Sequence, residues 1–536
     1  MVMTPRPAAT LILLREGTEV LMLQRTQSAA FLGGAYVFPG GSLDPQDNSS
    51  DRVVGLTQAQ ANERLKVSSG GIAYYVAAIR ECFEEAGILL ARERNGAPLS
   101  AERAETLMHW RNKPFRELLE AEDLYIPAGE LAYYGHWITA PGRSRRFDAR
   151  FFVALAPAGQ RGSHDAAETV HDVWITPREA LERAGRGEIE LVNATQQSLK
   201  ELARFADARA AFEHARALSE IDENRACWAQ GKEGAKIFRR GDAPYFEVHW
   251  SDPGESGETT YDLVAGAPKR LDRWVTRLIA PNPGLMTGPG TNTYIVGGVA
   301  VIDPGPAIDS HIEKILENKN LKWILCTHTH LDHSPAAAAV KAATGAQILG
   351  RPAPAGQDAT FKPDATLENG QRVEVGGTAG SISLRAIHTP GHASNHLCYM
   401  LEETKMLFTG DHVMQGSTVV INPPDGDMRA YLKSLERLLG EEIAIIAPGH
   451  GYLIGAPHRE LKRLIAHRLN RERKVVAALE RLEHPSIEEM LPLVYDDVPE
   501  RIHRVAARSL TAHLEKLVAD GAVRVQAGAY TLVKSR

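Results

Sequence analysis

Hydrophobic positions recur at two different spacings in the N-terminal part of the chain. In the first 41 residues, three short apolar runs alternate with turn residues, which is typical of strands and hairpins. Residues 70–87 then place Val76, Ile79 and Phe83 on one helical face and end at Gly87, a residue type that commonly closes helices. This part of the sequence therefore predicts a group of strands followed by a long helix.

The rest of this region continues the mixture of strands and helices. Strand patterns occur at 130–139 and 145–156, and residues 172–184 combine a strand with a helix. Strands and helices that follow one another in this way must cover each other's apolar faces. We therefore expect one α/β domain at residues 1–200.

The pattern changes twice more toward the C-terminus. Between residues 266–457, seven strand-like apolar runs alternate with helical segments, which indicates a second layered α/β domain. Residues 458–536 predict three helices and a terminal β-ribbon, the order of a winged-helix unit. The interval 201–265 is expected to be a helical and extended junction, with an extended piece at 245–263.

Composition and charge narrow the possible classes of protein. With 536 residues, 43% hydrophobic and 24% charged, the chain is too long for a single core and has the composition of a folded multidomain protein. The net charge of −6 gives no overall signal for nucleic acid. Four separated cysteines without a C-x-x-C pair argue against a disulfide framework, and no apolar run approaches the ~20 residues of a membrane span. We expect a cytoplasmic protein.

Three histidines and one aspartate crowd into six positions of the turn that follows an apolar strand run. They are His328, His330, Asp332 and His333. Ser334 and Pro335 come next and predict the cap and first turn of a helix. Because His328 and His330 are two apart on extended chain, they point the same way. One turn can thus offer nitrogen ligands to one metal ion and a mixed pair to another.

Three more ligand-type residues each follow an apolar run, near a glycine or proline: His392, Asp411 and His450. Loops at strand ends can converge on one rim, so these residues predict a metal site. Imidazole and carboxylate suit Zn2+, with manganese or iron as alternatives, and a carboxylate bridging two ions would bring the pKa of a shared water to about 7. A lone histidine is more often an ordinary polar residue. We give that interpretation to three neighbours: His388, His396 and His412.

The seven residues resemble the ligand set of the metallo-β-lactamase superfamily, whose fold is an αββα sandwich. The resemblance implies a first zinc ion on His328, His330 and His392. It implies a second on Asp332, His333 and His450, with Asp411 as the bridge. Asp303 matches the supporting aspartate of the family, and the implied reaction is attack by a zinc-bound hydroxide that Asp332 orients.

Two longer segments, 281–294 and 416–439, resemble the branch of this superfamily that contains β-lactamase-like protein 2. That branch carries a C-terminal winged-helix-like domain, and the resemblance implies an endonuclease acting on single-stranded RNA. The segment TPGHASNH (389–396) resembles glyoxalase II relatives instead, which implies a thioester hydrolase as the alternative. Basic residues of the C-terminal unit are candidates for an RNA track, or else are solvated or packing residues. They are Lys462, Arg463, Arg468, Arg471, Arg473, Lys474, Arg504 and Arg508.

A second cluster of candidate ligands lies on the predicted helix 70–87. Glu81, Glu84 and Glu85 fall at i, i+3 and i+4, so their carboxylates share one helical face. A divalent cation with oxygen preference, most simply Mg2+, would remove their mutual repulsion and bridge to a diphosphate, while Arg80 could steady the array. The alternative is a solvated acidic helix face.

This helix resembles the end of the Nudix box. The FPGG segment ends at Gly41, and the run RECFEEAGI matches the R-E-U-x-E-E-x-G-U pattern. An insertion at 44–66 splits the box and removes its first glutamate, which Asp44 or Asp47 could replace. The resemblance implies Mg2+ or Mn2+ on the three glutamates, with Glu84 and Glu85 as candidate catalytic residues, and hydrolysis of a nucleoside-linked diphosphate. A split box of this kind resembles the coenzyme A diphosphatase branch of the family. Residues 21–41 partly match the signature sequence of that branch.

These patterns predict a bifunctional metal-dependent hydrolase, a Nudix α/β/α sandwich followed by a metallo-β-lactamase sandwich with a winged helix. The expected partners are a nucleotide or coenzyme A-type small molecule and, as a further candidate, single-stranded RNA, with no membrane. A third hypothesis makes the Nudix half a non-catalytic metabolite sensor. Arg143, Arg145 and Arg146 could meet substrate phosphates or form a polar hairpin tip. No Walker loop, G-x-G-x-x-G after a strand or G-x-S-x-G elbow is present, which argues against kinases, dehydrogenases and serine hydrolases.

Overall fold

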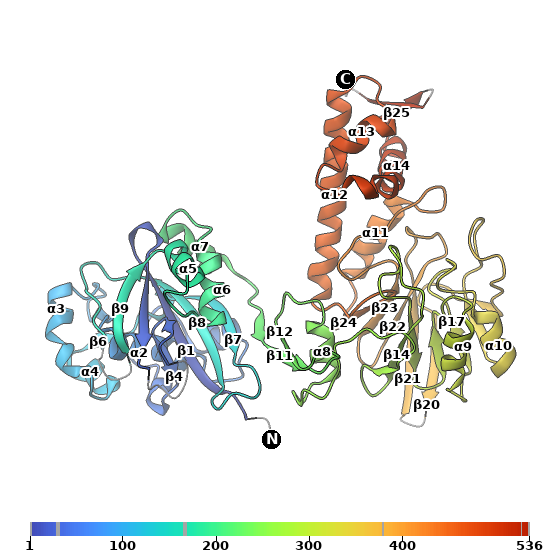
Figure 1. The fold of residues 1–536 in the computed structure, drawn as a ribbon. Coiled ribbons are helices and arrows are strands. Elements are labelled where there is room, and N and C mark those ends of the chain that lie inside the picture. Colours follow the sequence, from blue (N-terminus) through green and yellow to red (C-terminus); the bar gives the residue numbers. More distant parts are fainter. Residues whose placement is uncertain (1–2, 28–32, 165–168, 378–379, 527, 534–536) are drawn as a thin grey trace. The chain divides into compact units, whose positions relative to one another are not determined.

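The computed structural model divides the chain into two compact units, Met1–Trp228 and Ala229–Arg536, each with cores of its own (Figure 1). The structure describes residues 3–27, 33–164, 169–377, 380–526 and 528–533. Part of the segment that resembles the coenzyme A signature, residues 28–32, therefore lies outside the described residues. The division falls inside the expected junction, and the four domain bounds given above remain predictions.

The central strand of the first unit, β1 (Arg6–Leu14), faces two different cores. Leu11 and Leu13 pack with helix α2 (Gly71–Ala86), whereas Ile12 and Leu14 pack with helices of the opposite face. Successive side chains of a strand point to opposite faces, so one strand serves both layers. The α/β/α sandwich confirms the predicted fold of this half. The opposite helices are α5 (Pro177–Gly185), α6 (Asn193–Leu202) and α7 (Ala208–Ala217).

The sheet of this unit runs in the order β10-β7-β8-β1-β2-β3, with β4 on β1 and β9 on β2. Its other strands are β2 (Val20–Arg25), β3 (Tyr36–Val37), β4 (Gly40–Ser42), β7 (Ala132–Ile138), β8 (Phe147–Leu155), β9 (Thr169–Ile175) and β10 (Glu223–Arg225). The smaller elements are α1 (Gln58–Leu65), β5 (Arg92–Glu93), α3 (Ala101–Thr106), α4 (Phe115–Ala121), β6 (Leu124–Tyr125) and β11 (Cys227–Ala229). Helix α2 ends as predicted, because Gly87 adopts a φ of 67°.

Two sheets stack face to face in the second unit. A core that includes Ile302 and Leu325 from one sheet and Tyr399 and Phe408 from the other fills the space between them. Helices α9 (Asp309–Leu316) and α10 (Ala337–Thr344) cover the outer face of the first sheet, and α11 (Met428–Leu438) covers the second. This αββα order confirms the predicted sandwich.

The first sheet holds strands β13 to β19 in chain order, and the second holds β20 to β24. The first comprises β13 (Lys269–Arg270), β14 (Val275–Ile279), β15 (Asn292–Val296), β16 (Ala300–Ile302), β17 (Trp323–Leu325), β18 (Gln347–Gly350) and β19 (Ala365–Thr366). The second comprises β20 (Arg372–Gly377), β21 (Gly380–His388), β22 (Leu397–Leu401), β23 (Met406–Gly410) and β24 (Ile445–Pro448). A short strand, β12 (Lys236–Phe238), precedes both sheets in the chain.

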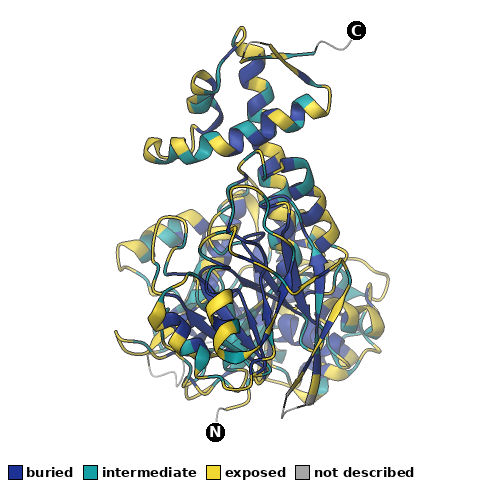
Figure 2. Cartoon of the chain, turned by 90° about the vertical axis from the view of Figure 1, so that its right-hand side faces the viewer, coloured by how far each residue is buried: buried dark blue, intermediate teal, exposed yellow. Residues whose placement is uncertain are grey.

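The long helix α12 (Pro457–Arg481) leads from the sandwich into a smaller helical part of the same unit (Figure 1). The remaining elements are α13 (Ile487–Val494), α14 (His503–Ala519), β25 (Val523–Gln526) and β26 (Ala529–Leu532). They share a core with α12 and complete the predicted winged helix. Figure 2 shows buried and exposed residues alternating along these helices, whereas the strands of the sandwich are mainly buried. Among the described residues, no helix has both the length and the apolarity needed to cross a membrane.

One segment of the expected junction folds differently from the prediction. Residues 245–263 were expected to be extended, but Tyr245–Ser251 form helix α8. Tyr245 and Val248 are buried three positions apart, which is helical spacing, and Glu247 is fully buried between them. The prediction was wrong because a stretch this short satisfies both periodicities.

The buried carboxylate of Glu247 joins three parts of the second unit. It accepts hydrogen bonds from Lys269 at 2.6 Å and from both terminal nitrogens of Arg277 at 2.6 and 2.9 Å. It also accepts the backbone N–H of Leu453 at 3.1 Å, and Arg277 donates to the carbonyl oxygen of Gly451 at 3.2 Å. A buried charge is tolerated only when it is paired and hydrogen-bonded in this way. No local pattern in the sequence revealed this cluster.

Candidate metal centres

Three histidine rings meet at the end of the second unit where the strands β17 and β21 end. The Nε2 atom of His328 and the Nε2 atom of His392 each lie 3.0 Å from Nδ1 of His330. The opposite nitrogen of His392 donates to the carbonyl oxygen of Val420 at 2.8 Å. Nδ1 of His328 lies 3.0 Å from the hydroxyl of Thr327, which itself donates to Asp303 and so accepts from the ring. Both Nε2 atoms therefore carry lone pairs that face His330.

A second group lies beside the first and mixes imidazole with carboxylate. Nε2 of His333 is 3.3 Å from Asp332 and 3.4 Å from Asp411, and Nε2 of His450 is 3.3 and 3.2 Å from the same two carboxylates. Nδ1 of His333 donates to Asp303 at 2.9 Å, and Nδ1 of His450 donates to a backbone carbonyl oxygen at 3.2 Å. Each ring therefore presents its Nε2 atom to the two carboxylates.

The buried atoms of the second group would be better satisfied by a metal ion than by the neighbouring side chains. Within the described residues, Nε2 of His333, Nε2 of His450 and Oδ1 of Asp411 are buried without a hydrogen-bond partner. Buried polar atoms of this kind normally have a partner, and a divalent cation would satisfy all three at once. The structure thus brings together all seven residues that the sequence singled out, as three histidines and a mixed group of four. Their roles as ligands remain predictions.

Electrostatics separate the two groups. Burial lowers the pKa of His328, and it lowers the pKa of His330 to about 4, so these rings are neutral and ready to bind a cation. Burial also lowers the pKa of His450, but the carboxylates of Asp411 and Asp332 outweigh it and raise that pKa to about 9. Without a cation the mixed group therefore holds protons, and a metal ion that bound there would release them.

Asp303 supports both groups through side chains next to it. Its carboxylate accepts the backbone N–H of Thr327 at 2.7 Å and the hydroxyl of Thr327 at 2.8 Å, and it accepts Nδ1–H of His333 at 2.9 Å. Asp303 adopts a φ of 50°, which is unusual for a buried residue that is not glycine. The strained backbone is held because the side chain fixes three donors at once.

The neighbouring histidines lie as polar residues around the centre. His396 is buried, its ring centroid lies 5.1 Å from that of His328, and its Nδ1 lies 3.0 Å from the hydroxyl of Thr389. His388 contacts the carbonyl oxygen of Ser394 at 3.2 Å, and His412 packs against the ring of Tyr431. None of the three belongs to either ligand group of the described residues.

Two local features were predicted differently or missed. Ser334 does not cap α10: its hydroxyl donates to Asp358 at 2.7 Å, and the helix starts later, at Ala337. The competing buried carboxylate takes the hydroxyl away from the helix end. Thr291, which the sequence analysis did not single out, donates to Oδ2 of Asp332 at 3.3 Å. Only its place inside the segment 281–294 pointed toward the site.

The glutamates of α2 are organised around one arginine in the first unit. Arg80 Nη1 donates to Glu81 at 2.9 Å and to Glu84 at 2.8 Å. Glu85 turns away and accepts the backbone N–H of Gly40 at 2.9 Å, so it ties α2 to the strand β4. The three carboxylates share one side of the helix as predicted, and those of Glu81 and Glu84 share Arg80 as a partner.

Of the two aspartates that could replace the first glutamate of the box, Asp47 is the one that contacts Arg80. Its two carboxylate oxygens accept from Arg80 at 3.0 and 3.1 Å, and the side chain is fully buried. Asp44 instead caps the short helix Pro45–Asn48 by accepting from the backbone N–H of Gln46. The insertion that removes the first glutamate of the box therefore supplies another carboxylate, that of Asp47, to Arg80.

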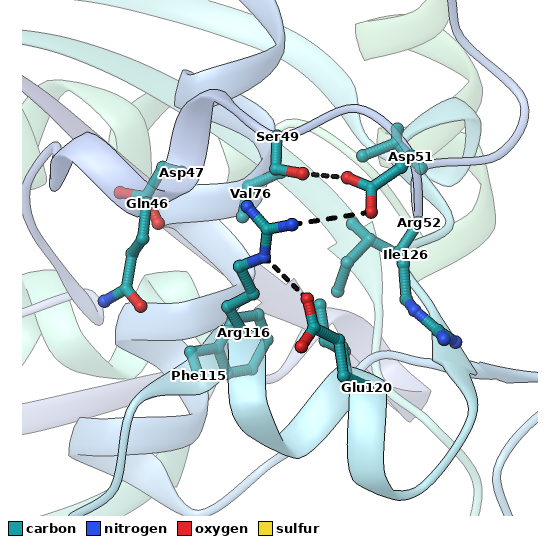
Figure 3. A pocket seen from close by; sticks show the side chains of 12 residues that line it. Gln46, Asp47, Ser49, Asp51, Arg52, Val76, Phe115, Arg116, Glu120 and Ile126 are labelled. Atoms are coloured by element: carbon teal, nitrogen blue, oxygen red, sulfur yellow. Dashed lines mark hydrogen bonds and ion pairs between the residues drawn. The ribbon is translucent and has the colours of Figure 1, made fainter.

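The insertion is held on α4 by charged side chains, which line a small pocket beside Asp47 (Figure 3). Arg116 of α4 donates to Glu120 at 2.7 Å and lies 3.8 Å from Asp51 of the insertion. The pocket has a volume of about 20 Å³, enough for a water molecule. These contacts are exposed and weak individually, so the buried pair of Arg80 and Asp47 does most to fix the insertion.

Close packing sets the protonation of this cluster. A Cβ atom at Gly41 would lie 2.5 Å from the carboxylate of Glu81, so only glycine leaves that carboxylate in place. Burial raises the pKa of Glu81 to about 7 although Arg80 opposes the rise, and burial also raises the pKa of Glu84. A divalent cation would favour the charged carboxylates, which is the chemistry that Mg2+ supplies in oxygen-rich sites.

The weaker basic candidates divide into buried and exposed residues. Arg468 and Arg471 are buried, and each donates to a backbone carbonyl oxygen inside the second unit. Arg146 is also buried and donates to the carbonyl oxygens of Thr139 and Met3. The idea that these three meet phosphate is wrong, because their guanidinium groups serve packing. The remaining candidates are exposed or half-buried: Arg143, Arg145, Lys462, Arg463, Arg473, Lys474, Arg504 and Arg508.

Fold and site together define a two-unit hydrolase that depends on metal ions. The metallo-β-lactamase superfamily model matches residues 286–450, the NUDT19 Nudix domain model matches 53–204, and the β-lactamase associated winged helix domain model matches 486–529. The chain belongs to the metallo-β-lactamase superfamily and carries a Nudix domain in its first unit. Both families use divalent metal ions.

Three similar proteins each match about half of the chain or less. The β-lactamase-like protein 2 homolog of Drosophila melanogaster is 30% identical over 282 residues, covering 49% of this chain and 94% of the relative. The thioesterase pkgB of Emericella nidulans is 32% identical over 244 residues, covering 44% of this chain and 67% of the relative. The crystal structure of a NUDIX hydrolase from Alicyclobacillus acidocaldarius is 30% identical and covers 39% of this chain and 96% of its own, with a TM-score of 0.33.

Proposed function

We propose that the second unit hydrolyses acyl thioesters and that the first unit cleaves a coenzyme A-type diphosphate. The observation that carries the thioester proposal is the similarity to proteins named as thioesterases. Besides pkgB, the atrochrysone carboxyl ACP thioesterase of Aspergillus chevalieri is 32% identical over 292 residues and is covered over 87% of its length. If the Nudix unit acts on a nucleotide or coenzyme A-type substrate, the substrates of both units would carry the same coenzyme A-type group.

Exposed apolar residues near the metal centre support an acyl substrate. Leu331, between His330 and Asp332, is 70% exposed, and Leu285 is 80% exposed. Leu285 lies in a loop whose end at Thr291 contacts Asp332. Large apolar side chains on exposed loops next to a site favour an apolar ligand. By contrast, two of the basic candidates for an RNA track, Arg468 and Arg471, are buried.

The side chains of this unit would act on the thioester in defined ways. Two zinc ions held by the two groups would supply activation of water and polarisation of the carbonyl. Thr291 holds Oδ2 of Asp332, and that carboxylate orients the attacking water. Water adds to the carbonyl carbon, the carbon–sulfur bond breaks, and the products are a carboxylic acid and a thiol. The thiol is a good leaving group, so no separate general acid is needed.

The proposal is tested by measuring thiol release from acyl-coenzyme A substrates of increasing chain length by the zinc-loaded protein. Asp332→Asn should reduce the rate at least 100-fold, because the orienting carboxylate is lost. His388→Gln is the matched control, since His388 lies next to the centre without belonging to a ligand group, and it should leave the rate unchanged. No thiol release by folded, metal-loaded protein would refute the thioester proposal.

A second candidate for this unit is cleavage of single-stranded RNA. It is favoured by the similarity to the β-lactamase-like protein 2 homolog and by the winged-helix match. Incubating the same zinc-loaded protein with 5′-labelled single-stranded RNA separates the candidates. Cleavage that Asp332→Asn abolishes, without thiol release from acyl thioesters, would establish the phosphodiester alternative.

For the first unit we propose Mg2+ or Mn2+ on Glu81 and Glu84, with Glu85 holding α2 against β4 beside the reacting diphosphate. The test is release of phosphorylated products from coenzyme A in the presence of Mg2+. Glu84→Gln should abolish turnover while Asp332→Asn leaves it unchanged. Binding of coenzyme A without turnover in the wild-type protein would favour the alternative, a metabolite sensor.

A further inference from the structure

A carbonyl group of the loop that follows Asp411 holds one ring of the three-histidine group. The carbonyl oxygen of Val420 accepts the Nδ1–H of His392 at 2.8 Å. This bond fixes the tautomer of His392 and turns its Nε2 lone pair toward His330. Partners of this kind are known to change metal affinity or activity by about 10- to 100-fold when they are lost.

Both neighbours of Val420 are held by the C-terminal winged helix. The carbonyl oxygen of Val419 accepts a hydrogen bond from Arg468 of α12. The backbone N–H of Ile421 donates to the hydroxyl of Ser509 on α14 at 3.3 Å. Val419 and Ile421 are 3% and 0% exposed, so water cannot replace either partner without opening the loop. The loop is thus clamped on both sides of the one carbonyl that His392 uses.

A second route runs through the ring beneath Arg468. The guanidinium of Arg468 lies 5.3 Å from the ring centroid of Tyr431 on α11. The backbone of Tyr431 packs so closely on Gly391 that a Cβ atom there would lie 2.4 Å from the Cα atom of Tyr431. Gly391 directly precedes His392 in the chain. Arg468 therefore touches the surroundings of His392 both through the loop and through the helix that supports Gly391.

We propose that Arg468 and Ser509 are positioning residues for the metal centre, so that the winged helix forms part of the metallohydrolase site and not a separate binding module. They act through Val419, Val420 and Ile421 on the orientation of His392. The proposal rests on the assignment of His392 as a metal ligand, which is part of the proposed function, but it does not depend on which substrate is cleaved. A change that moves α12 or α14 will alter the three-histidine group first and the mixed group of four less.

Helix α12 provides a closely matched control. Arg471, three residues after Arg468, is also buried, donates to the carbonyl oxygen of Val494 and lies 4.3 Å from the ring of Tyr495. Its other partner is Asp497 at 2.7 Å, so all of its described partners lie within the winged helix. Arg468→Met and Arg471→Met remove the same group from the same helix, and only the first removes a contact to the loop.

The experiment titrates metal-free full-length protein with Co2+ and follows the visible absorption bands of the bound ions. For Arg468→Met and Ser509→Ala we expect one of the two Co2+ ions to bind about 10-fold or more weakly, with a changed spectrum. Arg468→Lys keeps a donor for Val419 and should recover part of the affinity, while Arg471→Met should bind both ions like the wild type. If Arg468→Met does not fold, Ser509→Ala decides alone.

Two results would overturn the proposal. One is unchanged binding of both ions by Ser509→Ala and Arg468→Met. The other is an equal loss in Arg471→Met, which would show general destabilisation of the winged helix. His392→Ala is included to test the underlying assignment. If His392→Ala binds two Co2+ ions with wild-type affinity, then the ligand assignment in the proposed function has failed, which is a different result from failure of the positioning role.

Discussion

The two candidate metal sites of this protein are built in opposite ways. The centre in the second unit collects seven side chains from four loops between residues 328 and 450, and four of its histidines are fixed from behind by a hydroxyl, a carboxylate or a backbone carbonyl oxygen. The cluster in the first unit comes from one turn of α2, and a single guanidinium, that of Arg80, links two of its carboxylates to Asp47.

The two sites differ in how many contacts hold their side chains in position. The histidine centre is ordered by many separate contacts, so each lost contact should weaken one ligand and leave the others in place. In the glutamate cluster one cation holds Glu81, Glu84 and Asp47 together, so loss of that cation should release these three carboxylates. The changes that follow test this contrast, from the largest expected effect to the smallest.

Removing the central cation of the first unit should have the largest effect. Arg80→Met leaves the buried carboxylate of Asp47 without its partner, and breaking such a buried pair costs about 3–5 kcal/mol. We expect a large fall in the thermal unfolding midpoint of the first unit and loss of diphosphatase activity. Mg2+ should restore part of the stability, since a cation replaces the lost charge. A variant as stable as the wild type without Mg2+ would contradict the contrast between the sites.

Removing a supporting carboxylate of the second unit should affect function more than folding. Asp303→Ala deletes the acceptor for Thr327 and His333, so metal affinity and hydrolysis should fall by about 100-fold, while diphosphatase activity stays unchanged. Metal content and thiol release are the measurements. Asp309→Ala, at the exposed start of α9, is the control. Equal losses in both units would show that the sites are not independent.

A buried histidine near Asp303 should give the second unit an acid-sensitive stability. Burial lowers the pKa of His311 to about 4, below the 6.5 expected in the unfolded chain, and its Nε2 donates to Thr293 at 2.9 Å. Below pH 6.5 the unfolded state binds the proton more readily, so this contribution is complete above pH 6.5 and is lost as the pH falls toward 4. His311→Gln should remove about 3 kcal/mol of that loss, measured as the difference between the pH profiles of unfolding. Parallel profiles would rule out this source.

The smallest effect is expected at the glycine that faces Glu81. Gly41→Ala would place a methyl group 2.5 Å from the carboxylate of Glu81, whose flexible end can move aside. Stability should therefore change by less than about 1 kcal/mol, but Mg2+ affinity should fall several-fold because one carboxylate is displaced. Calorimetric titration with Mg2+ measures the change in affinity. Gly185→Ala is the control, because nothing lies within 4 Å of a Cβ atom there and its φ, like that of Gly41, is not in the left-handed region.

The sequence predicted the parts of the sites whose residue types are themselves rare and clustered. Four ligand-type residues in one turn, and three glutamates on one helical face, restrict the chemistry strongly, and strand and helix periodicity placed them on the right elements. Backbone partners were beyond the sequence, because every residue has a carbonyl group: nothing distinguished Val420 or Gly290 as acceptors for His392 and His450.

Two other features escaped prediction for a different physical reason. Arg468 resembled a surface charge on a basic helix, but its long side chain reaches inward to Val419. Helix α8 is too short for periodicity to decide, and the ion pairs that fix it join residues more than 20 positions apart. Contacts of this range depend on the complete fold, so local patterns do not record them.

The buried pairing of Glu247 decides where this chain can be cut for expression. A fragment starting at residue 266, after the expected junction, would keep Lys269 and Arg277 but lose their only described carboxylate partner. Two cations would then be stranded in an apolar interior, and such a product should collect in inclusion bodies. A fragment starting at residue 229 retains α8 and the complete cluster. Residues 229–265 match neither catalytic family model, but their presence would thus decide whether the expressed fragment is soluble.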